Sequence, residues 1–389
     1  MISFSKLLLD QSFYGDTLRY HPQAHGARQG TRQGLGPIVV WNCTKACNLA
    51  CRHCYASATT QAASGEMTTE EAKSFIDDLV DFSVPVLLFS GGEPLLRPDI
   101  FQLLAYGQER GLRMVISTNG TLIDGGVAAK IKALGVSYVG ISLDGLKTIN
   151  DDFRGKQGAF DLALQGLRHC RNAGQKTGLR LTLSKTTAQD LPAIFDLIEA
   201  EAVPRVCFYH LVYSGRGAAI VEDELSASEK RQVIDLIMDK TLDFARRGVA
   251  TEILTVDNHC DGIYLYQRMK AENPERAAKI LELLTLSGGN RSGVAIAAVD
   301  WMGDVYIDQF TRDIPLGNVR RQTFADIWQG DSHEFLQKLR HRQDFIVGRC
   351  ATCHYLPQCN GNFRARALST GDIWASDPAC YLSDKEISG

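Results

Sequence analysis

The chain has 389 residues, 44% hydrophobic and 22% charged, a composition typical of a folded enzyme that excludes a mainly disordered chain. Its formal net charge of −3 excludes a general nucleic-acid or membrane footprint. No apolar run approaches the roughly 18 residues that span a bilayer. The opening MISFSKLLLDQSFYGD is a poor signal peptide, so we expect a cytoplasmic protein.

From residue 37 onward, short β-rich runs alternate with amphipathic helical stretches. Candidate strands lie at residues 37–42, 85–90, 113–118, 137–144, 179–184 and 205–213. Helices are predicted at 68–82, which opens with a Thr-x-x-Glu capping box, and at 128–135 and 190–202. Six strand–helix units in succession predict an α/β fold with a parallel sheet, curled into a partial (β/α)6, TIM-like barrel.

The second half of the chain changes character after the sixth strand. We expect a long surface helix at 226–249, more helix at 264–290, and a hairpin at 294–310 around Gly303. The predicted division is an N-terminal segment (1–36), a barrel (37–225), a helical connection (226–292) and a C-terminal domain (293–389).

Four loops follow the first four predicted strands, at residues 43–56, 90–94, 117–120 and 142–145. In a parallel barrel the carboxyl ends of all strands face one rim, where catalytic loops collect. The sequence therefore predicts that these loops form one site.

Eleven cysteines in a cytoplasmic chain favour metal ligation or catalysis over disulfides. Cys47, Cys51 and Cys54 have the spacing C-x3-C-x2-C, which can place three thiolates on a cubane and leave its fourth iron open. The alternative is a zinc loop with Cys43 or His53 as fourth ligand.

A second group, Cys350, Cys353, Cys359 and Cys380, supplies four thiolates, enough to close a cluster or a zinc site. The remaining thiols stand alone and are expected to be small buried side chains; they are Cys170, Cys207 and Cys260.

The set WNCTKACNLACRHCYA, FSGGEPLL, STNG and SLDG, spread over roughly residues 37–215, resembles the radical SAM enzymes. That resemblance implies that Cys47, Cys51 and Cys54 bind a [4Fe–4S] cluster whose open iron is chelated by the methionine part of S-adenosylmethionine. Cys43 precedes the motif and is interpreted as a non-ligand.

S-adenosylmethionine carries an ammonium and a carboxylate, so its site needs acceptors as well as donors. Gly91 and Gly92 would allow close backbone approach, and Glu93 or nearby carbonyls could accept the ammonium. Asn119 is a further expected contact.

Ser142 and Arg154 are the expected contacts of the cofactor's carboxylate and ribose, because a guanidinium fork suits a carboxylate. The alternative for Arg154 is a surface ion pair, and Asp144 could equally cap its loop.

The C-terminal cysteines resemble the SPASM-type extension of many radical SAM enzymes. That similarity implies an auxiliary [4Fe–4S] cluster, with structural zinc as the alternative. Where a further cysteine might follow the strand GDVYI, the chain has Asp308-Gln309-Phe310, so we predict one auxiliary cluster and not two.

Basic residues cluster before the barrel and in the C-terminal tail, where they could grip a polycarboxylate, and a His or Tyr there could meet a bound iron or relay a proton. The alternative is a solvated basic segment. The candidate substrate contacts are Arg19, Tyr20, His21, His25, Arg28, Arg364 and Arg366.

The opening and LRYHP segments and the tail CATCHYLPQCNGNFRARA resemble radical SAM enzymes of alternative haem and haem d1 synthesis. The resemblance implies removal of acetate side chains from 12,18-didecarboxysiroheme to give iron-coproporphyrin III. Enzymes of haem d1 synthesis and iron-coproporphyrin decarboxylases are the rivals within that group. A peptide-modifying radical SAM enzyme, or a non-enzymatic iron–sulfur or zinc protein, are more distant alternatives.

The proposed partners are the iron tetrapyrrole and an electron donor such as a ferredoxin or flavodoxin, with no nucleic acid and no membrane. Tyr209 and His210 end the sixth predicted strand and are candidates for substrate contact or hydrogen donation. Packing at the barrel rim is the alternative for both.

Overall fold

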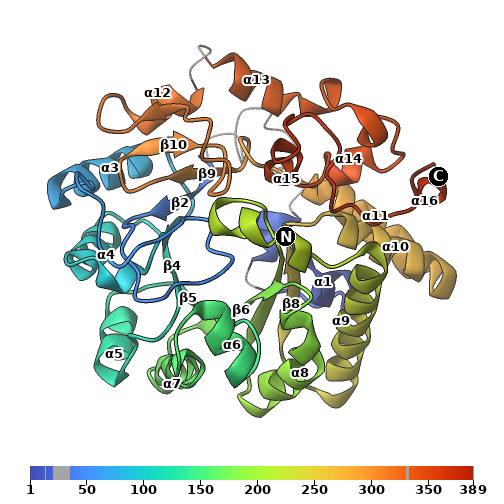
Figure 1. The fold of residues 1–389 in the computed structure, drawn as a ribbon, viewed down its shortest axis with the longest axis horizontal. Helices are drawn as coiled ribbons and strands as arrows, with labels where there is room; N and C mark the ends of the chain where they lie inside the picture. Colours follow the sequence, from blue (N-terminus) through green and yellow to red (C-terminus); the bar gives the residue numbers. More distant parts are fainter. Residues whose placement is uncertain (14, 21–35, 330–332, 389) are drawn as a thin grey trace.

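The computed structural model describes residues 1–13, 15–20, 36–329 and 333–388. A single sheet with the order β1-β8-β7-β6-β5-β4-β3-β2-β9-β10-β11 runs through it (Figure 1). Its strands are β1 (Ile2–Ser3), β2 (Ile38–Asn42), β3 (Leu87–Ser90), β4 (Met114–Thr118), β5 (Tyr138–Ser142), β6 (Thr177–Leu183), β7 (Arg205–His210), β8 (Glu252–Val256), β9 (Ile296–Val299), β10 (Asp304–Tyr306) and β11 (Gly317–Asn318).

All six predicted strands form, as β2 to β7, and each pairs in parallel with the next. The sheet extends further than predicted, because β8 pairs in parallel with β7 and β9 with β2. The result is an open α/β sheet that curls into a partial barrel, as expected.

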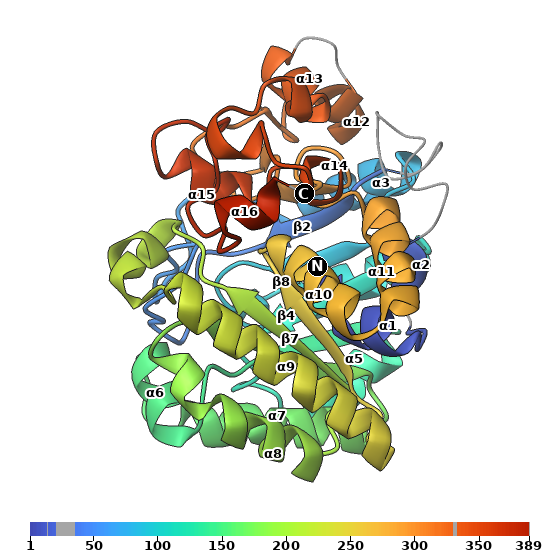
Figure 2. The same cartoon turned by 90° about the vertical axis from the view of Figure 1, so that its right-hand side faces the viewer.

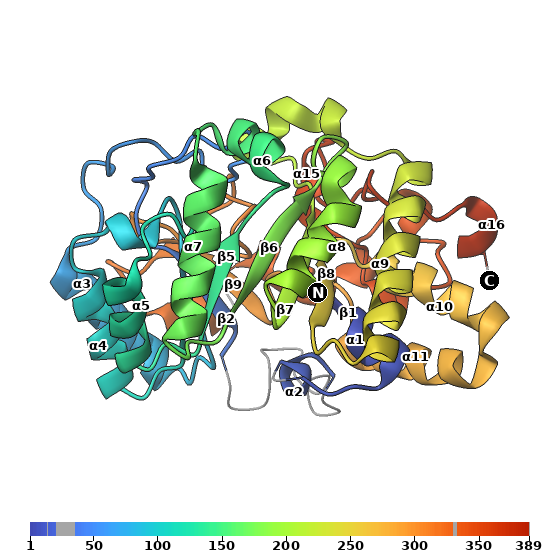
Figure 3. The same cartoon turned by 90° about the horizontal axis from the view of Figure 1, so that it is seen from below.

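Helices cover the outer face of the curled sheet (Figure 3). The first, α3, begins with the predicted capping box between Thr68 and Glu71 and buries residues at helical spacing, Phe75 and Leu79 among them. The others are α4 (Ile100–Glu109), α5 (Gly125–Ala133), α6 (Lys147–Arg154), α7 (Ala159–Asn172), α8 (Leu191–Ala200) and α9 (Ala227–Arg247), with α3 spanning Thr69–Asp81.

The N-terminal residues extend the sheet at the β8 edge. β1 pairs antiparallel with β8, and α1 (Phe4–Leu9) follows it, held by bonds from Arg276 to the carbonyls of Lys6 and Leu7. After α2 (Asp16–Arg19) the chain reaches the predicted contacts His21, His25 and Arg28, which lie outside the described residues.

The C-terminal part packs together at one side of the barrel (Figure 2). The predicted hairpin is β9–β10, and Gly303 at its turn has φ +87°, a conformation that favours glycine. The helices of this half are α10 (Cys260–Glu272), α11 (Pro274–Ser287), α12 (Phe324–Gln329), α13 (Glu334–Arg340), α14 (Leu356–Cys359), α15 (Arg364–Leu368) and α16 (Asp384–Ile387). In the described ranges no helix is long and apolar enough to cross a membrane.

Candidate active site

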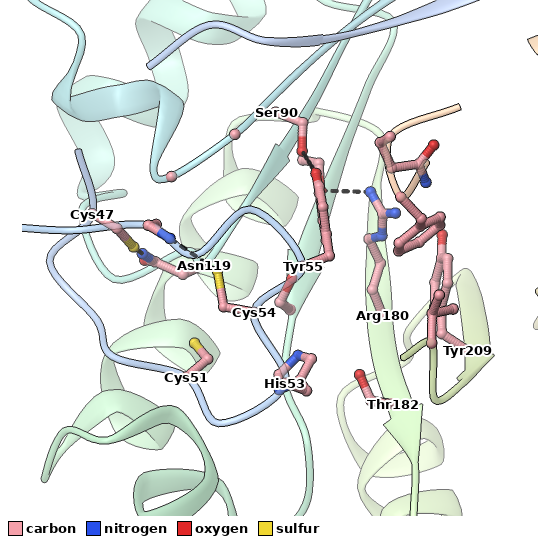
Figure 4. Close-up of a pocket in the computed structure, with 18 of the residues that line it drawn as sticks. Cys47, Cys51, His53, Cys54, Tyr55, Ser90, Asn119, Arg180, Thr182 and Tyr209 are labelled. Atoms are coloured by element: carbon pink, nitrogen blue, oxygen red, sulfur yellow. Dashed lines mark hydrogen bonds between the residues drawn. The ribbon is translucent and has the colours of Figure 1, made fainter. Parts of the chain in front are cut away.

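The loops after β2, β3, β4 and β5 meet at the carboxyl ends of the strands, as predicted, around one cavity. We call it the cysteine cavity, because the thiols of Cys47, Cys51 and Cys54 line one side of it. Figure 4 shows these sulfurs across from Arg180 and Tyr209.

The cysteine loop is held by backbone bonds to two other segments. Ala50 and Arg52 donate their N–H groups to the carbonyls of Arg154 and Phe153 at the end of α6, at 3.1 and 2.9 Å. Arg216 donates to the carbonyls of Cys51 and Ala58, at 2.8 and 2.7 Å, which closes the loop from the other side. These bonds fix the path of the backbone that carries the three thiols.

Each of these sulfurs faces a hydrogen-bond donor. The backbone N–H groups of Leu49 and Ala58 lie 3.4 Å from the Sγ atoms of Cys47 and Cys54. The Arg154 Nη1 lies 3.8 Å from the Cys51 Sγ. Burial raises the pKa of the Cys47 thiol to about 11 and so favours its neutral form. The hydrogen-bond donors beside the sulfurs act in the opposite direction, because they favour the thiolate that binds iron.

Cys43 and His53, the possible fourth ligands, differ in their surroundings. Cys43 is fully buried outside the cavity, and burial raises the pKa of its thiol to about 12. His53 lines the cavity and stacks on Phe153, with its Nε2 3.5 Å from Asp144. Burial lowers the pKa of His53 to about 4.

Gly91 and Gly92 line the cavity and also carry the cysteine loop. A Cβ on Gly92 would lie 2.0 Å from the Ala46 carbonyl oxygen, and Gly91 has φ +123°, so neither position tolerates a side chain. These glycines therefore let the loop after β3 approach the backbone of the cysteine loop closely.

Glu93 does not line the cavity, contrary to expectation. It is fully buried, and its carboxylate accepts hydrogen bonds from Leu95 N, Thr118 Oγ1 and Asn119 N. These donors use the carboxylate to tie the β3 and β4 loops together, so the ammonium of a cofactor is left to backbone carbonyls.

Ser142, Asn119 and Arg154 all line the cavity, as the sequence predicted. Arg154 forms an ion pair with Asp144 at 2.5 Å, a buried pair and not the surface pair considered as its alternative. Burial alone would raise the pKa of Asp144, but Arg154, His53 and Thr182 lower it, so the carboxylate is ionised. The Arg154 fork is thus already engaged on one side.

Tyr209 and His210 point to opposite faces of β7, because side chains alternate along a strand. Tyr209 lines the cavity under the guanidinium of Arg180, 4.7 Å from its ring centroid. The His210 imidazole is buried and lies 2.9 Å from Asp261 on α10. His210 is thus part of the cavity wall, but its imidazole is already engaged by Asp261 and is not free to contact a substrate.

Sequence analysis missed Arg180, a half-buried cation on β6 that lines the cavity. It donates to the Ser117 Oγ at 2.5 Å, and no carboxylate pairs with it within the part of the chain that the structure describes. A Cβ at Gly140 on the neighbouring strand would lie 2.7 Å from the Arg180 Cδ, so that glycine makes room for it. The available signal was a charged residue inside the apolar strand LRLTLS.

A second cavity of about 350 Å³ lies inside the barrel and adjoins the first. We call it the arginine chamber, because the described residues that line it include five arginines and only two carboxylates, Asp257 and Asp308. Residues 287 and 289–292 and residues 308–310 of the C-terminal half complete its wall. The residues shared by the two cavities are Val40, Leu88, Arg180, Tyr209, Asp257, Gln309 and Phe310. The arginines are Arg19, Arg113, Arg180, Arg205 and Arg291.

The predicted contacts Arg364 and Arg366 are not available to a substrate. Both are fully buried. Arg364 donates to the carbonyls of Ile373 and Ala375 at 2.8 Å, and Arg366 pairs with Asp377 at 2.9 Å. They stabilise the tail because they satisfy its buried carbonyls and its buried carboxylate.

Of the described N-terminal candidates, Arg19 lines the arginine chamber, where Asp16 and Glu252 pair with it. Tyr20 is buried, and its hydroxyl accepts a hydrogen bond from the Ser3 N–H at 3.1 Å. Tyr20 therefore packs the N-terminal segment and lines neither cavity.

The second cysteine group lies in the tail, and its thiols are close enough to interact electrostatically. Arg349 donates to the Cys380 Sγ at 3.5 Å. Cys260, expected to be an isolated buried thiol, is buried and donates to the Asn258 Oδ1 at 2.9 Å, and its interaction with Cys380 lowers the pKa of Cys380 to about 6. All eleven cysteines are free.

The sequence matches the family described as the radical SAM superfamily over residues 41–198, and an iron–sulfur cluster-binding SPASM domain over residues 292–354. It is 50% identical to the Fe-coproporphyrin III synthase of Methanosarcina barkeri, covering 100% of this chain and 99% of that protein. This chain belongs to the radical SAM superfamily. It is a radical SAM enzyme, whose domain binds a [4Fe–4S] cluster and S-adenosylmethionine, with a C-terminal iron–sulfur domain.

Two further relatives of this radical SAM enzyme have names that refer to haem-type products. The pre-heme d1 synthase of Dinoroseobacter shibae is 39% identical over 96% of this chain and 92% of its own. The AdoMet-dependent heme synthase of Nitratidesulfovibrio vulgaris is 33% identical over 95% and 98%. The structure of Streptococcus suis SuiB bound to S-adenosylmethionine matches with a TM-score of 0.69 at 16% identity, over 90% of this chain and 78% of that chain, and shows the shared fold.

Proposed function

We propose that this enzyme removes acetate side chains from 12,18-didecarboxysiroheme and forms iron-coproporphyrin III. The observation that carries the proposal is the 50% identity to a Fe-coproporphyrin III synthase across essentially the full length of both chains. The identity to the pre-heme d1 synthase is lower, at 39%, which makes haem d1 synthesis the second candidate.

Cys47, Cys51 and Cys54 are the proposed ligands of the catalytic cluster, since they alone bring thiols to the cysteine cavity. When bound, the cluster and S-adenosylmethionine supply the electron and the 5′-deoxyadenosyl radical that starts the reaction. Arg154 holds positive charge beside the Cys51 sulfur and would favour its thiolate. Gly91, Gly92, Asn119 and Ser142 present backbone and polar groups to the cofactor.

The second cysteine group is proposed to hold one auxiliary [4Fe–4S] cluster through Cys350, Cys353, Cys359 and Cys380. Cys380→Ala should then lose about four irons per chain. Cys260→Ala is the matched control and should keep its iron, because Cys260 is not among the proposed ligands and its thiol donates to the Asn258 Oδ1. An unchanged iron content in Cys380→Ala would point to zinc or to another fourth ligand.

Tyr209 is the proposed side chain for substrate contact, because it lies where the two cavities meet. The proposed domain division remains 1–36, 37–225, 226–292 and 293–389, with the radical SAM match inside the second part. An iron tetrapyrrole is the proposed substrate and a ferredoxin or flavodoxin the electron donor. The proposed compartment is the cytoplasm, where eleven free thiols stay reduced.

The test is an anaerobic assay of cluster-reconstituted enzyme with S-adenosylmethionine, a low-potential reductant and didecarboxysiroheme, read by mass spectrometry. We expect iron-coproporphyrin III together with 5′-deoxyadenosine. Deoxyadenosine without a changed tetrapyrrole would refute the proposed reaction. Parallel reactions with iron-coproporphyrin and with the haem d1 precursor would then test the rival reactions.

A further inference from the structure

The arginine chamber contains an imidazole that the fold does not use. His259 follows β8, lines the chamber and is only 8% exposed. Its Nδ1 is buried without a partner, and no hydrogen bond to its ring is seen among the described residues. The Nε2 of the same ring is not enclosed in this way and has no hydrogen bond among the described residues, so it is the ring atom open to a ligand in the chamber.

The backbone around His259 fixes where the ring lies. Its N–H donates to the Asn362 Oδ1 at 2.6 Å, and Asn362 Nδ2 in turn donates to Asn258 at 2.7 Å. These bonds anchor the residue between β8 and the tail. Burial and nearby cations lower the pKa of His259 well below its usual value, so the ring is neutral and keeps a lone pair for a metal.

The charge of the chamber suits a large polyanion. Arg205 has a buried Nη2 without a partner, although its Nε pairs with Glu252 at 2.5 Å. Arg180 carries no ion pair within the described ranges and reaches both cavities. Guanidinium groups that retain free donors match the carboxylates of a tetrapyrrole edge.

The size and position also fit. A cavity of about 350 Å³ falls in the range of small-molecule sites, 300–1,000 Å³. Because the arginine chamber shares Arg180, Tyr209 and Phe310 with the cysteine cavity, a ligand in it adjoins the place where the radical forms. Enclosure there holds a target carbon near the reactive group.

We propose that the arginine chamber binds the iron tetrapyrrole and that the imidazole of His259 is an axial ligand of its iron. The identity of the tetrapyrrole rests on the proposed function, whereas the binding of an iron porphyrin in the chamber does not. It also places the bound iron beside the tail, since the His259 N–H donates to Asn362, three residues after Cys359 of the second cysteine group.

The test uses the cluster-loaded enzyme titrated anaerobically with ferric iron-coproporphyrin III, followed by absorption and electron paramagnetic resonance. The wild type should show iron with a nitrogen axial ligand. His259→Ala should lose that signal and bind about tenfold more weakly, equivalent to about 1.4 kcal/mol. Added imidazole should restore the wild-type spectrum of the variant.

Two further variants keep the result interpretable. His259→Gln preserves the side-chain volume but cannot supply an imidazole, so it should also lose the signal. His169→Ala on the outer helix α7 removes a histidine that lines neither cavity and should match the wild type. Iron content and S-adenosylmethionine cleavage of each variant establish that it is folded.

An unchanged iron spectrum in both His259 variants would overturn the inference, as would a wild-type complex without a nitrogen ligand. The turnover of didecarboxysiroheme by the wild type is measured separately. If it fails while the His259 signal stands, the proposed reaction is wrong and the binding site is right.

Discussion

The cysteine cavity and the arginine chamber are lined in part by the same strands but differ in their side chains, with thiols in the cavity and arginines in the chamber. The cavity lies at the carboxyl ends, where loops bring in three thiols and small polar groups such as Ser90 and Ser142. The chamber lies inside the barrel, where inward-pointing strand residues such as Tyr138 and Arg205 meet the C-terminal half of the chain. Loops therefore bring the thiols to the rim, and the strands bring the arginines to the interior.

The largest expected effect is the loss of activity when a thiol of the cysteine cavity is removed and the arginine chamber is left unchanged. Cys51→Ala should abolish 5′-deoxyadenosine formation, because it removes one of the three thiols proposed to hold the cluster. It should leave the chamber able to bind iron-coproporphyrin III. Chromatography of the cleavage products and a porphyrin titration check the two halves of this prediction.

Cys43→Ala is the matched control for that experiment. Cys43 is buried outside the cavity, so its loss should cost about 1 kcal/mol of stability, typical of a point mutation, and preserve substantial cleavage activity. If Cys43→Ala loses the catalytic cluster, the proposed ligand set is wrong.

Arg180 lies on the boundary between the two regions, so its replacement shows which of them it serves. Arg180→Met should weaken iron-coproporphyrin III binding by about tenfold, about 1.4 kcal/mol, because the variant loses a guanidinium that has no ion pair among the described residues. Affinity for S-adenosylmethionine should change less. Equilibrium titrations with both ligands measure this.

The control for Arg180 is Arg246→Met on α9, whose side chain is 76% exposed and should bind both ligands normally. The opposite pattern in Arg180→Met, with weaker S-adenosylmethionine binding and an unchanged porphyrin affinity, would assign Arg180 to the cysteine cavity.

The last prediction concerns stability and not ligand binding, at the acid side chain that both regions share. Burial raises the pKa of Asp257 from 3.8 to about 6. The unfolded chain ionises this group near pH 4, whereas the folded chain keeps the proton to about pH 6, so stability falls as pH rises between these values. Asp257→Asn should therefore gain about 1–3 kcal/mol over the wild type above pH 6.

Thermal unfolding of both proteins from pH 4 to 7.5 measures that gain. Residue 257 has φ +65°, which asparagine tolerates well, so a small gain independent of pH is expected in addition. A stability difference that stays constant across this pH range would contradict the raised pKa.

Much of the fold followed from local patterns. The six parallel strands, the capping box at Thr68 and the hairpin at Gly303 were predicted because alternation, caps and turns act over a few residues. Strand β8, which lies between β1 and β7, was missed, because EILTV is short and buried along its whole length and so lacks a periodic signal.

The same distinction between local patterns and tertiary contacts applies to the candidate site. The sequence by itself determined the three-cysteine loop, the glycines beneath it and the second cysteine group, since each is a local spacing of reactive side chains. Only the tertiary structure decided that Glu93, His210, Arg364 and Arg366 are occupied by partners within the protein, and that Arg180 and His259 face a cavity. Whether a side chain is buried or hydrogen-bonded depends on residues distant in sequence, such as Asp261 for His210 and Asn362 for His259. The spacing of residues along the chain does not reveal these contacts.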